Sequence, residues 1–163
     1  MTIHDIGKNS MSILTGAYDH SVDAKNRIRI PAKLKTDLGV KTDKDNKFSL
    51  VFHTGTDGCI AVYTQEAVDK IFAPFAEVKQ SDFEKYRAVR RYLNTFETVE
   101  SDPQGRLVVP PKFRKHAQID KDLVICGMVD HVEIWAKEVY DKYFGIEDTD
   151  VTDVNDLVKI LGI

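Results

Sequence analysis

The chain has 163 residues, 42% of them apolar, which is enough to bury a core in one or two small domains and argues against general disorder. Its longest apolar stretch is far shorter than the roughly 20 residues that cross a bilayer, and the N-terminus lacks the layout of a signal peptide, so we expect a cytoplasmic protein with no membrane partner. The formal net charge of −3 argues against binding of nucleic acid through overall charge, so any such binding must come from local basic patches.

The first part of the chain divides into an N-terminal extension over residues 1–10 and a first module over residues 11–80. A turn is predicted at Asp23-Ala-Lys-Asn-Arg, early in the module. Asp23 is of the residue type that accepts a hydrogen bond at the start of a turn, and Asn26 is of the non-glycine type that best tolerates the left-handed backbone region. Both residues are therefore predicted to structure a loop between two strands.

The strand after this turn has a charged face and an apolar face. In Arg27-Ile-Arg29-Ile, alternate side chains point to opposite sides, so both arginines share one face. Pro31, like Pro110 of the second module, suits the first position of a short helix, in which Leu34 with Leu38, or Phe113 with Ala117, lies one turn apart on a buried stripe. Guanidinium groups on a rigid hairpin can bind phosphates or guanine edges in the major groove. The residues of this module predicted to bind DNA are Lys25, Arg27, Arg29 and Lys33.

A connector helix is predicted over residues 81–96. Ser81-Asp-Phe-Glu84 has the pattern of a capping box, and apolar residues follow it at helical spacing as far as Phe96. Because no Gly/Ser-rich linker separates the two modules, we expect them to pack as one compact unit. The helix also carries basic residues, which we interpret as a solvated face or as a face between subunits: Lys85, Arg87, Arg90 and Arg91.

A second module over residues 97–144 repeats the first. Its Asp-Pro-Gln-Gly-Arg motif follows the first motif at an offset of 79 residues, with the aspartate, the arginine, a proline and a lysine in step. Asp102 and Gly105 are predicted to structure this second loop. Arg106 and Lys112 are predicted to bind DNA, although Arg106 could instead meet a neighbouring subunit, because valine replaces the second arginine of its strand.

Further matches at an offset of 72 residues extend the repeat to the end of each module. They pair Ile60 with Val132 and Tyr63 with Trp135, for example. The difference between the two offsets requires a loop insertion in the first module, and the polar run 42–47 supplies it. Each module is thus predicted to be a strand, a turn, a strand, a short helix, two strands and a helix. The predicted fold class is α+β.

The end of the chain, residues 145–163, is predicted to be an acidic tail. Five acidic residues against one lysine give it a net charge of −4, so the rest of the chain carries +1. We interpret the tail as an arm that limits nonspecific DNA binding or, equally, as a segment for self-association.

The sequence carries no pattern typical of an enzyme or of a metal site. Cys59 and Cys126 lack the spacing of a metal knuckle or a redox pair and are interpreted as buried apolar side chains. The five histidines share no ligand spacing, and no motif pairs a nucleophile with a base. We therefore expect no catalytic residue, metal, cofactor or small-molecule substrate.

Two classes of function remain. The first is a DNA-binding regulator, in which an oligomer presents one basic loop per subunit to successive DNA sites. The alternative is a protein-interaction scaffold whose basic loops dock acidic partners and never touch DNA. RNA binding is disfavoured, because no exposed aromatic platform for stacking bases is evident.

The residues that carry the repeat also resemble a known family. Gly16-Ala-Tyr-Asp-His-Ser-Val-Asp-Ala-Lys-Asn-Arg-Ile-Arg-Ile-Pro-Ala-Lys33, paired with Asp102-Pro-Gln-Gly-Arg-Leu-Val-Val-Pro110, is similar to the MraZ family, as are Asp57-Gly-Cys-Ile60 and Glu133-Ile-Trp135. The resemblance runs from about residue 11 to residue 144.

This resemblance implies a bacterial transcriptional regulator with two tandem SpoVT-AbrB-like modules, related to the swapped-hairpin fold and assembled as a homo-oligomeric ring. Such proteins bind repeated promoter sites in double-stranded DNA upstream of the division and cell-wall gene cluster, usually as repressors, which implies a nucleoid-associated protein. In the family the arginine of the first loop contacts DNA, and it falls on Arg27 here. Two departures are Asn26, in place of the usual glycine, and Ser101, in place of an apolar residue, which implies weaker pairing of the strand before the second loop.

Overall fold

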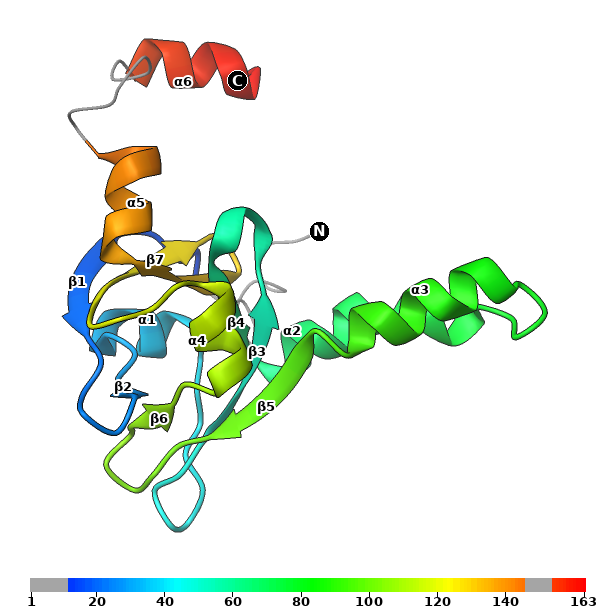
Figure 1. Cartoon of the computed structure of the whole chain (residues 1–163), viewed down its shortest axis with the longest axis horizontal. Helices are drawn as coiled ribbons and strands as arrows, with labels where there is room; N and C mark the ends of the chain where they lie inside the picture. Colours follow the sequence, from blue (N-terminus) through cyan, green and yellow to red (C-terminus); the bar gives the residue numbers. More distant parts are fainter. Residues whose placement is uncertain (1–11, 146–153) are drawn as a thin grey trace, which may run out of the picture.

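A computed structural model describes residues 12–145 and 154–163 (Figure 1). The main element is a six-stranded antiparallel sheet with the strand order β1-β7-β8-β4-β3-β5. Its strands are β1 (Ala17–Ser21), β3 (Ser49–Thr54), β4 (Ile60–Tyr63), β5 (Phe96–Glu100), β7 (Asp122–Met128) and β8 (His131–Ala136). The predicted α+β class, with two repeats and short helices, is present.

Equivalent strands of the two repeats occupy equivalent positions counted from the two edges of the sheet, and the repeats exchange their first strands. β1 of the first repeat pairs with β7 of the second, and β5 of the second repeat pairs with β3 of the first. The registers are equivalent as well, since Ala17 lies opposite Cys126 and Phe96 lies opposite His53. Each repeat therefore completes the sheet of the other, and the two form one interlocked unit.

A second, two-stranded sheet holds the two predicted loops together. β2 (Arg27–Ile28) follows the first loop, β6 (Leu107–Val108) follows the second, and the two strands pair antiparallel. In Figure 1 both lie at the lower left, below the main sheet.

Short helices follow these strands, one residue later than expected. Pro31 and Pro110 are the N-caps of α1 (Ala32–Asp37) and α4 (Pro111–His116) instead of their first helical residues. Extended backbone at each proline, with ψ of 136° and 149°, accounts for this difference. The predicted buried stripe is present, and its residues are Leu34, Leu38, Phe113 and Ala117.

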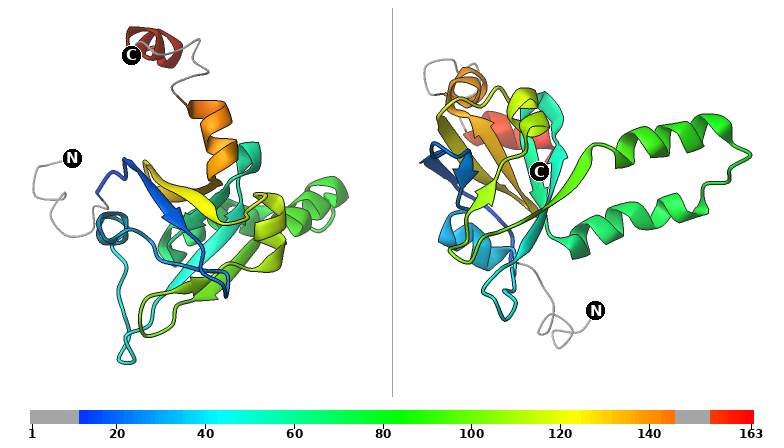
Figure 2. Two further views of the ribbon diagram at one scale, coloured as in Figure 1. Left: turned by 60° about the vertical axis from the view of Figure 1, so that its left-hand side comes forward. Right: turned by 60° about the horizontal axis from the view of Figure 1, so that its bottom comes forward.

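The connection between the repeats is a helical hairpin that extends away from the sheet, as the right-hand view of Figure 2 shows. It consists of α2 (Gln65–Phe72), the 3-10 helix η3 (Ala73–Glu77) and α3 (Phe83–Leu93). Two details of the expected connector are wrong. Asp82 instead of Ser81 caps α3, accepting a hydrogen bond from the Lys85 amide at 3.2 Å. Phe96, expected on the helix, is the first residue of β5.

One core joins the repeats. Phe52 and Phe113, one from each repeat, are fully buried and meet edge to face, with ring centroids 5.7 Å apart. Ser101 is also buried and continues the pairing of β5 with β3. Its amide donates to the Phe48 carbonyl at 2.7 Å, and its hydroxyl accepts from the Phe48 amide at 3.0 Å. The expectation that Ser101 weakens this strand is therefore wrong.

The remaining helices lie at the C-terminal end: α5 (Lys137–Phe144) and α6 (Val154–Leu161). The predicted N-terminal extension, residues 1–10, lies outside the described residues. Residues 146–153 of the predicted tail lie outside them as well. Within 12–145 and 154–163, no helix combines the length and the apolar character needed to cross a bilayer. The same residues contain no cluster of three metal-ligating side chains.

Candidate nucleic-acid interface

The two Asp-x-x-x-Arg loops have the same hydrogen-bond pattern. Asp23 accepts the amides of Lys25 and Arg27 on Oδ1, both at 2.9 Å, and Asp102 accepts those of Gln104 and Arg106 at 3.0 and 2.9 Å. The second carboxylate oxygen of each aspartate accepts from the arginine Nε at 2.6 Å. The aspartate thus fixes both the turn and the guanidinium.

The tips of both loops adopt the left-handed conformation that the sequence indicates. Asn26 has a φ of 59° and Gly105 a φ of 81°, and each amide donates to the carbonyl of its loop's aspartate at 3.0 Å. Asparagine can replace glycine here because it is among the residues that visit this region at low cost. The two loops therefore share one backbone shape.

Ionised aspartates are favoured in this geometry. Hydrogen bonding from the Arg27 amide, supported by its side chain, lowers the pKa of Asp23 below its ordinary value. For Asp102, partial desolvation opposes ionisation, but the bonds from Arg106 outweigh it and lower the pKa. Both loops therefore keep their carboxylates charged at neutral pH.

Direct contacts hold the loops side by side. Ile28 lies opposite Leu107 in the two-stranded sheet, and the Val109 amide donates to the Asn26 carbonyl at 2.9 Å. Nη1 of Arg29 reaches across to the carbonyl oxygen of Gln104 at 2.6 Å. Arg29 therefore links the first loop to the second, a role that the alternating pattern alone did not indicate.

The two loop arginines differ in their remaining donors. The side chains of Arg27 and Arg106 are 23% and 30% exposed, and each uses Nε for its aspartate. Nη2 of Arg106 also donates to the side-chain oxygen of Gln104 at 3.3 Å. Among the described residues, the terminal amino groups of Arg27 have no partner, so they are free to bind a ligand.

The predicted lysines occupy different places. Lys25 is exposed at the tip of the first loop. Lys33 pairs with Asp37 on α1 at 3.1 Å. Lys112 pairs with Glu97 at 3.3 Å and donates to the Asn94 carbonyl at 3.4 Å, so its side chain lies near the start of β5, whereas the second loop follows the end of that strand.

Two features near the loops were missed as site elements. Lys35 crosses to the second loop, with its ammonium 4.4 Å from the ring centroid of Phe48 and close to Gly105. The run 42–47, interpreted only as an insertion, folds as a third loop whose Asn46 side chain donates to the Pro103 carbonyl at 2.7 Å. Its Asp-x-x-Asn-Lys pattern repeats that of the first loop, with lysine for arginine, and could have identified it.

The cysteines lie apart from these loops. Cys59 is buried and Cys126 half-buried, beside Trp135. Burial raises the pKa of the Cys59 thiol to about 12 and that of Cys126 to about 11. Both therefore remain protonated and unreactive at neutral pH, which fits their interpretation as packing residues.

Comparison with known proteins gives a consistent result. Residues 13–91 and 93–154 match the sequence model of the family described as "MraZ protein, putative antitoxin-like". A relative from Thermoanaerobacter sp. (strain X514) is 33% identical over 93% of this chain and all of its own length. A relative from Cytophaga hutchinsonii is 35% identical over 82% of this chain and 85% of its own.

A third relative, from Acetivibrio thermocellus, is 32% identical over 91% of this chain and 98% of its own. All three bear the name "Transcriptional regulator MraZ", which describes a regulator and not an enzyme, in agreement with the expectation from the sequence. On the family match over most of its length, the chain belongs to the MraZ family.

Proposed function

We propose that this chain is a transcriptional regulator that binds double-stranded DNA through the first Asp-x-x-x-Arg loop. The observation that carries the proposal is the geometry of Arg27, whose Nε is held at 2.6 Å by Asp23 while its terminal amino groups have no partner among the described residues. A guanidinium fixed in this way offers two donors in a plane, which suits a phosphate or the O6 and N7 atoms of guanine.

Hydrogen bonds from Asp23 to the backbone and to Arg27 hold the loop in one shape, so little conformational entropy is lost on binding. The other predicted contacts act around Arg27. Lys25 adds an exposed charge at the same tip, and Arg29, Lys33, Arg106 and Lys112 contribute positive charge to neighbouring parts of the surface. Asp23, Asn26, Asp102 and Gly105 hold the two loops in shape.

The modules are proposed to be of the SpoVT-AbrB type, related to the swapped-hairpin fold. The exchange of first strands between the repeats supports this, because each half of the sheet is completed by a strand from the other half. Under this proposal the paired strands β2 and β6 present both loops on one side of the molecule.

A homo-oligomeric ring is proposed as the active form. With a net charge of −3, one subunit offers only a small basic surface, and one loop makes few phosphate contacts. Several loops on one assembly could engage repeated promoter sites together, so that avidity compensates for the weak single contact. Following the family resemblance, we propose that these sites lie upstream of the division and cell-wall gene cluster, that the protein represses the cluster and its own promoter, and that it acts at the nucleoid in the cytoplasm.

The proposal is tested by fluorescence anisotropy, with the DNA upstream of the protein's own coding sequence and a scrambled fragment of equal length, at two salt concentrations. We expect salt-dependent binding that is tighter for the natural fragment and is weakened in Arg27→Ala by about 5-fold or more, since a bidentate contact contributes roughly 1–3 kcal/mol. The matched control is Lys70→Ala, an exposed charge on α2, which should bind as wild type. Absence of binding by the wild type would reject the proposal in favour of a scaffold that docks acidic partners. Equal binding by Arg27→Ala would reject the first loop as the DNA contact.

A further inference from the structure

The run 42–47 reproduces the backbone of the two Asp-x-x-x-Arg loops. Asp43 and Lys47 pair through the Asp43 amide and the Lys47 carbonyl at 2.7 Å, and the Asn46 amide donates to the Asp43 carbonyl at 3.0 Å. Oδ1 of Asp43 accepts the amides of Asp45 and Lys47 at 2.8 and 2.9 Å. With a φ of 60° at Asn46, each of these features has a counterpart at Asp23–Arg27 and at Asp102–Arg106.

This third loop lies directly beside the second. The side-chain amide of Asn46 donates to the Pro103 carbonyl at 2.7 Å, which joins the two tips. Arg29 joins the second loop to the first in the same way, through Gln104. The three loops thus form a connected row, and Figure 1 shows them together at the lower edge of the molecule, the third one in cyan.

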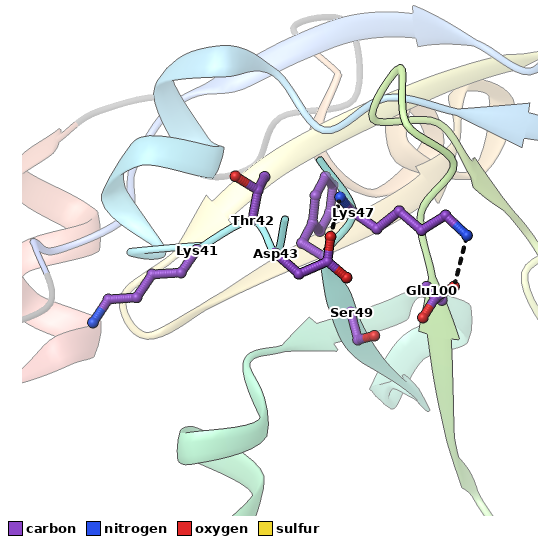
Figure 3. A pocket seen from close by; sticks show the side chains of 7 residues that line it. Lys41, Thr42, Asp43, Lys47, Ser49 and Glu100 are labelled. Carbon is purple, nitrogen blue, oxygen red and sulfur yellow. Dashed lines mark hydrogen bonds and ion pairs between the residues drawn. The ribbon is translucent and has the colours of Figure 1, made fainter. Parts of the chain in front are cut away.

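The residue at the position of the arginine behaves differently in the third loop. Lys47 extends toward β5, where its ammonium lies 3.5 Å from the Glu100 carboxylate (Figure 3). Lys47 therefore fastens the base of the loop to the sheet and does not present a guanidinium-like group at the tip. Lys44 is an exposed cation at the tip, and the neighbouring Asp45 is exposed as well.

We propose that the loop Asp43–Lys47 is a third contact to the same DNA, in which Lys44 binds a backbone phosphate next to the site occupied by the first two loops. This inference rests on the proposed function of Arg27. An ammonium is a compact point charge without a planar fork, so the third loop adds affinity and position but does not read bases. It extends the contact to phosphates that the first two loops do not reach.

Asp45 limits the strength of this contact. In the first loop the equivalent position holds Lys25, and in the second it holds Gln104. A carboxylate at the tip repels the phosphate that Lys44 attracts, because both charges lie in the same exposed turn. Removing the charge of Asp45 should therefore tighten binding, whereas removing that of Lys44 should weaken it.

The test measures anisotropy titrations of the full chain at several salt concentrations for the wild type, Lys44→Gln, Asp45→Asn, Arg27→Ala and the control Lys70→Gln. Loss of one phosphate contact makes the fall of log affinity with log salt less steep, by about 1 in the slope. It also weakens binding roughly fivefold at 0.1 M salt. We expect both changes in Lys44→Gln, for the natural and the scrambled fragment alike, and tighter binding in Asp45→Asn. Thermal melting checks that the variants are folded.

The outcomes separate the two proposals. If Arg27→Ala loses binding while Lys44→Gln equals Lys70→Gln in affinity and slope, the third contact is wrong and the proposed function stands. The third contact is also wrong if Asp45→Asn binds more weakly than the wild type. If the wild type does not bind DNA, or Arg27→Ala binds as well as the wild type, the proposed function fails and the third contact fails with it.

Discussion

The guanidinium of Arg29 donates to the carbonyl oxygen of Gln104 at 2.6 Å, which joins the two loops through residues that are 75 positions apart in the chain. The contact is charge-assisted and short, but it is exposed at the surface, so we expect it to contribute little to the free energy of unfolding. Its main effect is to fix the position of one loop against the other.

Replacing Arg29 by alanine should release this link. We expect DNA affinity to fall severalfold, through loss of charge and of loop alignment, while the free energy of unfolding falls by no more than about 1 kcal/mol. Arg29→Lys keeps the charge without the planar fork and should recover only part of the affinity. Anisotropy and urea denaturation measure the two effects. A variant that binds normally would show that the link is dispensable.

Replacing Asp23 by asparagine should disorder the first loop, because an amide oxygen is a weaker acceptor for two backbone amides and offers Arg27 no charge. We expect DNA affinity to fall by about as much as in Arg27→Ala. Asp102→Asn is the matched variant in the second loop, and a smaller loss there would show that the loops are not equivalent. Amide NMR shifts of residues 23–27 report loop order directly.

The same carboxylate predicts a pH effect. The pKa of Asp23 is lowered in the folded state, so the stability that it contributes is present above the unfolded pKa near 3.9 and is lost as the pH falls through the lower folded value. Below that value the loop should lose its ordered amide shifts while the core of the sheet remains folded. Loop amide shifts that titrate at or above the unfolded pKa near 3.9 would contradict this prediction.

His131 should make stability depend on pH in the opposite direction. Burial favours its neutral form, but hydrogen bonds to Glu133 and Asp130 outweigh burial and raise its pKa. The stability it contributes is therefore complete below the unfolded pKa near 6.5 and is lost as the pH rises through the folded value. Urea denaturation should show His131→Asn more destabilised at pH 5.5 than at pH 8.5. Equal destabilisation at both pH values would rule out this role for the charged form.

Phe113→Ala tests whether the repeats share one core. The ring is fully buried against Phe52 of the other repeat, and its removal should cost about 3–5 kcal/mol. Because each repeat completes the sheet of the other, we expect a single transition when Trp135 fluorescence and far-UV circular dichroism are followed together. Two separate transitions would show that the repeats unfold independently.

Local chemistry in the sequence was sufficient to predict the repeat, the order of its elements and the loop shape. Asp23 with Asn26 and Asp102 with Gly105 carry the turn in a few neighbouring residues, so no distant contact is needed to specify it. The buried stripe of α1 follows from spacing alone, as Leu34 and Leu38 show.

Features that depend on distant partners could not be predicted in this way. Nothing near Ala17 indicates that it lies opposite Cys126, and a repeat pattern is equally consistent with two independent modules. Ser101 appeared to be a defect in a strand, because its hydrogen bonds to Phe48 depend on a register set elsewhere. The place of the third loop beside Pro103 likewise depends on folding, although its Asp-x-x-Asn-Lys pattern alone could have identified the turn.

Because β1 and β5 are exchanged between the repeats, the sheet would be stable only at sufficient protein concentration if the repeats were separate chains. Two separate polypeptides, each carrying one repeat, could form the same sheet only by meeting in solution, and they would dissociate at low concentration. The helical hairpin between Gln65 and Leu93 covalently tethers the halves and makes their encounter unimolecular, with a high effective concentration. The tether also allows the two halves to carry different side chains at equivalent positions, arginine at 29 and valine at 108, which a symmetric pair of identical chains could not do.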